Sequence, residues 1–157
     1  AGSFLRTGDL GFLHQGELYV SGRVKDLIIV RGVNLYPHNI EASVDYCPRV
    51  TRPGCGIAFA IDAEEGDRLV FAQEIGKADI EHAHAICGAI HKVIVEQHEV
   101  QPYAIVLIES GSIPKTTCGK LSRGPCRQQY LNGSLQQLAS WINPIYRHVP
   151  TVIGSPA

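Results

Sequence analysis

An apolar repeat at helical spacing, from Asp79 to about Gln97, constrains the fold of this chain most strongly. Its members are Ile80, Ala83, Cys87, Ile90 and Ile94. Residues spaced in this way share one face of an α-helix, which must be buried against a neighbouring element. Asp79 carries a side chain suited to the helix N-cap. The segment therefore predicts a long amphipathic helix packed on a sheet.

Short strand patterns flank this helix on both sides. Runs rich in β-branched and aromatic residues, bounded by turn residues, predict strands at 11–13, 17–20, 27–30, 56–61, 68–75 and 104–108. His14-Gln15-Gly16 supplies a hairpin turn between the first two runs. The runs at 56–61 and 68–75 are expected to pair antiparallel. Two more helices are expected, one opening at Tyr36-Pro37 and one from Ser122 to Leu131.

These elements predict an α+β fold: a small antiparallel three-stranded sheet with about three helices, preceded by a β-hairpin and a hinge. Residues 1–24 would form a linker and the hairpin, residues 25–133 the main domain, and residues 134–157 a tail anchored by Trp141. A chain of 157 residues is long enough to bury one core.

Charge and cysteine content exclude several function classes. Lys plus Arg number 14 and Asp plus Glu number 15, so no net field attracts nucleic acid or an anionic membrane. No apolar run approaches the roughly 20 residues that span a bilayer. The five cysteines are odd in number and include no close C-x-x-C pair, which argues against a disulfide framework and a zinc knuckle. We expect a protein of the reducing cytoplasm, with no membrane span and no nucleic-acid partner.

The loop that begins at Ser110 ends in Lys120, at the entry of the last predicted helix. A P-loop needs four residues between its glycines and Ser or Thr after the lysine. Here seven residues separate Gly111 from Gly119, and Leu121 follows the lysine, so a P-loop is excluded. What remains is an ammonium that stays charged near neutral pH. Judged alone, it is most simply a solvated surface lysine.

The surrounding motif changes that interpretation. The run Pro114-Lys115-Thr116-Thr117-x-Gly119-Lys120-Leu121-x-Arg123 resembles the terminal motif of the adenylate-forming superfamily of acyl-CoA synthetases, luciferases and peptide-synthetase adenylation domains. The resemblance covers about residues 4–133. It implies that Lys120 is catalytic and contacts the substrate carboxylate and the nucleotide phosphate during adenylation. A fixed cation placed at developing negative charge lowers such a barrier.

The same resemblance assigns roles to other positions. Thr7-Gly8-Asp9 resembles a ribose-binding motif, in which the Asp9 carboxylate would accept hydrogen bonds from both ribose hydroxyls. Arg23 matches an arginine that also reaches the ribose, and Lys25 matches a hinge position. Residues 25–133 would then be a mobile lid that rotates between adenylation and thioester formation, with the loop around Gly32 facing the acceptor. Without the resemblance, the first motif is simply a turn, and Arg23 and Lys25 a charged strand edge.

A finer resemblance points to fatty acyl-AMP ligases. It rests on Lys25-Asp26-Leu27-Ile28-Ile29-x-Arg31-Gly32-x-Asn34-x-Tyr36-Pro37-x-x-Ile40-Glu41 and on Cys126-Arg127-x-x-Tyr130-Leu131. It implies an enzyme that activates a fatty acid with ATP and Mg²⁺ to acyl-AMP and transfers the acyl group to an acyl carrier protein. Leu35 and Cys118 depart from the pattern, in which histidine and serine are common there. The alternatives are the lid of an acyl-CoA synthetase and a non-catalytic docking module.

The resemblance also implies what lies outside this chain. The adenine pocket, the fatty-acid tunnel and the phosphate loop belong to a larger amino-terminal domain, so we expect an inactive fragment whose first partner is that domain. No metal site is expected within the chain. His84, His91 and His98 recur every seven residues, about 10.5 Å of helix rise, which is too far apart for one ion. Cys118 has no fixed histidine partner, so a nucleophilic role is not expected.

Overall fold

The structure, a computed structural model, describes residues 5–146. Its strands are β1 (Asp9–His14), β2 (Glu17–Arg23), β3 (Ile28–Val30), β4 (Val33–Leu35), β5 (Gly56–Ile61), β6 (Arg68–Ile75), β7 (Ala104–Glu109) and β8 (Gln137–Ile142). Its α-helices are α1 (Pro37–Asp45), α2 (Ala83–His98) and α3 (Arg123–Leu131), and short 3₁₀ segments cover Val24–Asp26, Lys77–His82 and Pro144–Tyr146. No helix in this range is long and apolar enough to cross a membrane.

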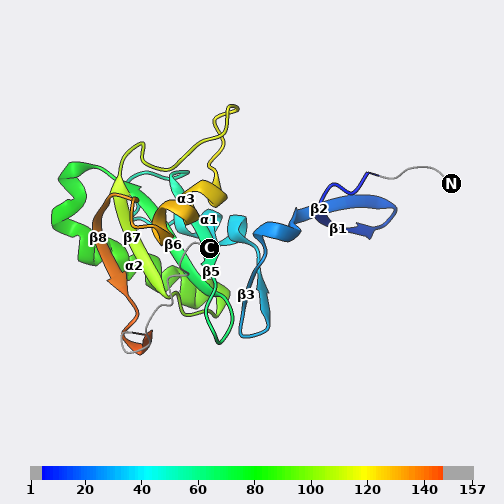
Figure 1. Cartoon of the computed structure of the whole chain (residues 1–157), viewed down its shortest axis with the longest axis horizontal. Coiled ribbons are helices and arrows are strands. Elements are labelled where there is room, and N and C mark those ends of the chain that lie inside the picture. The colour runs from blue at the N-terminus through cyan, green and yellow to red at the C-terminus, as the bar shows by residue number, and fades with distance from the viewer. Residues whose placement is uncertain (1–4, 147–157) are drawn as a thin grey trace.

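A four-stranded mixed sheet in the order β5-β6-β7-β8 lies at the centre (Figure 1). β5 pairs antiparallel with β6, β6 parallel with β7, and β7 antiparallel with β8. The α+β class and the three α-helices are confirmed for the described residues, but the antiparallel three-stranded sheet is wrong. The long helix α2 connects β6 to β7, and such a crossover lets both strands run in the same direction. β8 adds a fourth strand from the segment predicted to be a tail.

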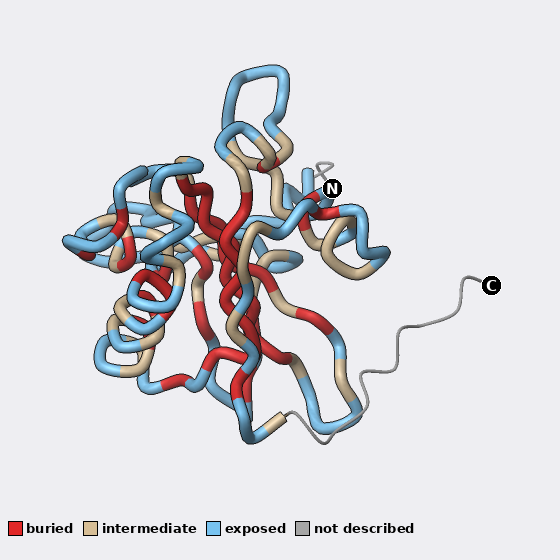
Figure 2. Tube along the Cα trace, turned by 90° about the vertical axis from the view of Figure 1, so that its left-hand side faces the viewer, coloured by how far each residue is buried: buried red, intermediate tan, exposed pale blue. Residues whose placement is uncertain are grey.

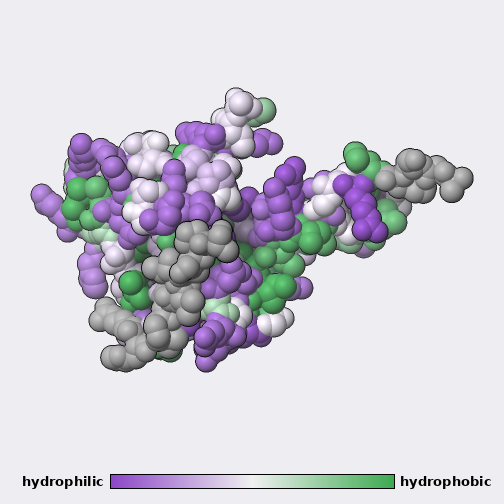
Figure 3. All heavy atoms as spheres, in the orientation of Figure 1, coloured by the Kyte–Doolittle hydropathy of each residue, from purple (hydrophilic) through white to green (hydrophobic). Residues whose placement is uncertain are grey.

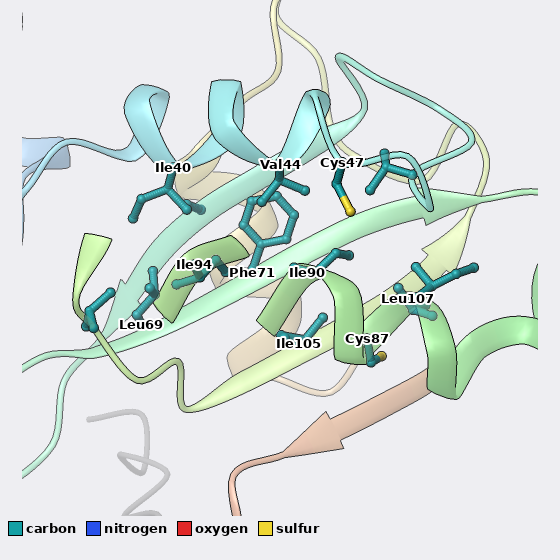
Figure 4. Packing of buried hydrophobic residues seen from close by; sticks show 14 of the residues in the cluster. Ile40, Val44, Cys47, Leu69, Phe71, Cys87, Ile90, Ile94, Ile105 and Leu107 are labelled. Carbon is teal, nitrogen blue, oxygen red and sulfur yellow. The ribbon is translucent and has the colours of Figure 1, made fainter. Parts of the chain in front are cut away.

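Both faces of this sheet are covered, which explains why its central strands are rich in apolar residues. All eight residues of β6 are buried, and the central strands form the buried middle of the molecule in Figure 2. α1 and α2 pack on one face, where Ile40, Phe71 and Ile90 meet (Figure 4). α3 covers the other face, over Phe59 and Val70. Strands covered on both sides have continuous apolar runs instead of an alternating pattern.

Helices α1 and α2 follow the predicted apolar stripes, with one correction at the start of α2. α1 opens with Pro37 and buries Ile40 and Val44. α2 begins at Ala83 rather than at Asp79, because residues 77–82 form a 3₁₀ segment. The Asp79 carboxylate accepts hydrogen bonds from the Gly76 N–H at 3.1 Å and the Thr51 hydroxyl at 2.9 Å. Asp79 therefore stabilises the 3₁₀ segment instead of capping α2.

Trp141 anchors the end of the described chain, as predicted. Its ring lies edge-on to the His91 ring of α2, with the two centroids 4.7 Å apart. Leu138, Ala139 and Trp141 are partly buried and pack against the core under α2. The anchor therefore belongs to strand β8 of the central sheet.

The predicted β-hairpin is present and projects from the rest of the molecule (Figure 1). β1 and β2 pair antiparallel around Gln15-Gly16, and every residue from 11 to 20 is exposed. We call residues 5–23 the arm and residues 26–146 the body. Lys25 lies in the short segment that joins them.

A candidate active-site groove between the arm and the body

A groove of about 580 Å³ brings together residues from the arm, the junction and the body. Asp9 and Arg23 line it from the arm, Lys25 from the junction, and Lys120 from the loop before α3. These are four of the five positions singled out in the sequence. The fifth, Gly32, is not among the described residues that line the groove; it lies in the turn between β3 and β4.

The backbone around Lys120 is fixed by a tight hairpin loop. Thr116 N–H donates to the Lys120 carbonyl at 2.8 Å, and Lys120 N–H donates to Thr116 Oγ1 at 3.2 Å. Gly119 has a φ of +79°, a left-handed conformation that glycine adopts without a Cβ penalty, and its N–H donates to the Thr116 carbonyl at 2.8 Å. The Lys120 side chain is exposed. The loop thus presents a charged side chain from a fixed backbone into the groove, where it can meet an anionic ligand.

A buried carboxylate holds the start of this loop. Glu74 of β6 is 1% exposed, and its Oε1 accepts a hydrogen bond from the Ile113 N–H at 2.9 Å. Beneath the end of the loop, burial raises the pKa of Cys126 to about 11, with a further contribution from the Glu74 charge. This thiol therefore stays protonated near neutral pH and contributes packing. Cys118 is exposed at the loop's tip.

Asp9 and Arg23 face each other across the hairpin. They are register partners, and Asp9 Oδ1 lies 3.4 Å from Arg23 Nε. The Thr7 hydroxyl accepts a hydrogen bond from the Asp9 N–H at 3.2 Å. Both side chains are exposed, and a surface ion pair contributes only about 0–1 kcal/mol. A ligand with two hydroxyl groups can therefore replace this pairing at small cost.

The arm approaches the body beside the groove. A Cβ on Gly22 would lie 3.1 Å from Cδ1 of Tyr36, so glycine at this position lets the Tyr36 ring approach the strand. The 3₁₀ segment containing Lys25 follows, closed by a hydrogen bond from Leu27 N–H to the Val24 carbonyl at 3.3 Å. Few contacts cross this junction, which is consistent with a pivot near Lys25.

The sequence interpretation assigned no functional role to several residues that line the groove. Tyr36, Pro37 and His38 line it from the start of α1, and Arg123 lines it from the start of α3. Arg123 also forms ion pairs with Glu41 and Asp26. Arg123, Glu41 and Asp26 all stand in the motifs, but only the folded chain shows that they meet.

The histidines of α2 have separate surroundings. His84 is exposed, His91 contacts Trp141, and His98 Nε2 lies 2.9 Å from the Ser43 hydroxyl of α1. Within residues 5–146, no three His, Cys, Asp or Glu side chains gather in a way that could hold a metal ion.

Comparison with known proteins shows the family to which the chain belongs. A family model described as Disco-interacting protein 2-like, AMP domain, matches residues 25–140. JamA of Moorena producens, named as a medium-chain-fatty-acid (acyl-carrier-protein) ligase, is 43% identical over 141 residues, which are 87% of this chain and 23% of that protein. The fatty acid AMP ligase from Legionella pneumophila matches in structure with a TM-score of 0.60 and 38% identity, covering 90% of this chain and 25% of that one.

A fourth match has a higher TM-score at lower identity. The structure described as McyG A-PCP complexed with phenylalanyl-adenylate has a TM-score of 0.75 and 28% identity, over 82% of this chain and 20% of that one. This chain spans about a quarter of the length of the curated relatives it matches. The family model covers most of the body, including the Lys120 loop, and begins at Lys25. The chain therefore belongs to the Disco-interacting protein 2-like AMP domains, within the superfamily of adenylate-forming ligases.

Proposed function

We propose that this chain is the carboxyl-terminal lid of a longer fatty acyl-AMP ligase. That enzyme would activate a fatty acid with ATP to acyl-AMP and transfer the acyl group to an acyl carrier protein. The observation that carries the proposal is the single groove lined by Asp9, Arg23, Lys25 and Lys120. The similarity to a fatty acid AMP ligase and to a carrier-protein ligase supports the choice of substrate and acceptor.

In the proposed reaction, the body side of the groove contacts the phosphate and the arm side contacts the ribose. Lys120 would place its ammonium at the negative charge that develops on the nucleotide α-phosphate as pyrophosphate leaves. Asp9, which offers two acceptor oxygens, would hold the ribose hydroxyls, with Arg23 beside it. Mg²⁺ would accompany ATP, held mainly by the amino-terminal part of the enzyme.

The sheet and the family match support the boundaries that we propose for the lid. The match begins at Lys25, which supports a hinge there. We place the end of the lid at Ile142 instead of at residue 133, because β8 pairs with β7 in the central sheet. Rotation about Lys25 would turn the face that carries Lys120 away from the substrates. The face that carries Gly32, at the tip of the β3–β4 hairpin, would then face them.

The acceptor and the catalytic role separate this proposal from its alternatives. An acyl-CoA synthetase would differ only in using coenzyme A, and a docking module would have no need of Lys120. The name of JamA favours the carrier protein. Incubation of the full-length protein with ATP and a fatty acid, followed by either coenzyme A or a holo carrier protein, distinguishes all three.

Lys120→Ala in the full-length protein is the direct test of catalysis. Acyl-AMP formation should fall by about a hundredfold or more, because one preorganised charge donor is lost. Transfer from preformed acyl-AMP should suffer far less. Lys115→Ala, which removes a lysine from the same loop, is the matched control and should retain activity. Equal losses in both half-reactions with an intact fold would contradict the proposed role.

This chain alone should release no pyrophosphate from ATP and a fatty acid, since most of the substrate pocket would lie in the rest of the enzyme. Robust turnover by the purified chain would contradict the lid assignment.

A further inference from the structure

Arg123 connects three elements around the junction. It is the first residue of α3, three positions after Lys120. Its Nε and Nη2 atoms donate to the two carboxylate oxygens of Glu41, and its Nη1 lies 3.7 Å from Asp26 Oδ2. It lines both the groove and a second cavity of about 310 Å³ that Lys25 and Asp26 also line.

Glu41 joins this cluster to the rigid part of the body. It belongs to α1, and its Oε1 also accepts a hydrogen bond from the Ala58 N–H of β5 at 2.9 Å. Its side chain is only 17% exposed, so the pair with Arg123 is less screened by water than most surface pairs. Arg123 is thus held by its own helix, α3, and through Glu41 by α1 and the central sheet.

Asp26 is the opposite end of the connection. It closes the 3₁₀ segment Val24–Asp26 and directly follows Lys25. Its ion pair with Arg123 tethers the end of the 3₁₀ segment to α3. This ion pair favours changes of backbone angles at residues before Asp26 over changes at Asp26 itself.

We propose that Arg123 is a positioning residue that fixes the body end of the hinge relative to the Lys120 loop. Its contribution to the reaction rests on the proposed function, whereas the coupling itself concerns only the chain described here. A guanidinium suits the task because its planar fork binds Glu41 through two hydrogen bonds while a third nitrogen faces Asp26. Lysine carries the same charge but cannot make this arrangement.

A neighbouring ion pair provides a matched control. Arg127, one helical turn further along α3, donates from Nε to the Ala60 carbonyl at 2.8 Å and from Nη2 to the Asp62 carboxylate. Asp62 follows β5 and lines the same cavity as Asp26, but its ion pair is with Arg127. Asp62→Asn therefore weakens an α3 ion pair in the same surroundings without removing a charge partner of Arg123 or Asp26.

Amide exchange of the whole chain, measured by NMR, tests the coupling. The reporter is the Leu27 N–H, whose bond to the Val24 carbonyl closes the hinge segment. The quantity compared is the protection factor of this amide, the intrinsic exchange rate for each variant's own sequence divided by the measured rate. Asp26→Asn and Arg123→Lys should each lower it about two- to fivefold, the scale of one partly exposed ion pair. Asp62→Asn should leave it unchanged. An unchanged protection factor in both hinge variants, or the same decrease in Asp62→Asn, would overturn the proposal. Should Arg123→Lys fail to fold, Asp26→Asn alone decides.

Kinetics of the full-length protein give a second readout. Arg123→Lys should lower kcat for acyl-AMP formation roughly tenfold and leave the KM for ATP unchanged, because Lys120 is misplaced while the ribose site is intact. A rise in KM with unchanged kcat would contradict a positioning role. If Lys120→Ala retained full activity, the proposed function would fail, and the exchange of Leu27 would still decide whether Arg123 couples the hinge to the loop.

Discussion

The arm and the body use apolar residues in opposite ways. In the body, Phe71 and most of the isoleucines are fully buried between the sheet and its helices. In the arm, Phe12 is 56% exposed and Leu13 75% exposed. Figure 3 shows hydrophobic surface on the projecting hairpin. The body is stabilised by its own core, whereas the arm has two strands and little to pack against.

This difference indicates how the groove is assembled. An isolated two-stranded hairpin is marginally stable in water, while a covered four-stranded sheet is stable on its own. The proposed catalytic lysine, Lys120, is therefore presented by the body, and the proposed ribose ligands by the weakly supported arm. Any change in the orientation of the arm alters the groove without disturbing the core.

The largest expected effect comes from a matched pair of phenylalanines. Phe71→Ala should lower the free energy of unfolding by about 3–5 kcal/mol, because it leaves a cavity in the core. Phe12→Ala should change it by less than about 0.5 kcal/mol, because that side chain is exposed. Chemical denaturation of both variants measures the contrast. Similar losses would mean that the arm and the body unfold as one packed unit.

The junction is tested next, by Lys25→Pro in the full-length protein. Proline fixes φ and removes an N–H, so this variant should trap one orientation of the lid. Loading of a holo carrier protein should slow by at least roughly tenfold while acyl-AMP formation is retained. Lys25→Ala, which keeps the backbone free, is the control. Wild-type rates in both steps would show that Lys25 is not a pivot.

Asp9→Asn tests the contribution of the arm to binding. It removes the charge and one of the two acceptor oxygens, so the KM for ATP should rise about fivefold, the scale of one hydrogen bond. The kcat should change less, in contrast to Lys120→Ala. Steady-state kinetics with varied ATP measure both constants. A fall in kcat alone would place Asp9 in the chemical step instead.

The smallest effect concerns the body alone and depends on pH. Partial burial between α1 and α2 lowers the pKa of His98 below its ordinary value of 6.5. The unfolded chain then binds this proton more readily than the folded chain, so the free energy of unfolding falls as pH drops through 6.5 towards the folded-state pKa. Denaturation at pH 7.5 and 5.5 should show a smaller loss in His98→Gln than in the wild type. Equal losses would exclude His98 as a cause.

Local sequence patterns were sufficient to predict most helices and strands and the loop before Lys120. The stripe through Ile40 and Val44 identified α1, and His14-Gln15-Gly16 identified the hairpin turn, because helical and turn signals depend on neighbours within a few residues. The start of α2 was misplaced because Asp79 bonds Thr51, which is distant in the sequence. The β8 strand was missed because the sequence of residues 137–142 has no regular alternation of polar and apolar residues, as suits a half-exposed strand at the sheet edge.

The sequence by itself determined the α+β class, and it predicted the roles of Lys120 and Asp9 and a hinge at Lys25. Only the tertiary structure decided that β7 runs parallel to β6, that Asp9 and Lys120 line one groove, and that Arg123 meets both Glu41 and Asp26. The physical reason is that side-chain type and spacing act along the chain, whereas pairing across a sheet or a groove depends on which distant segments pack together.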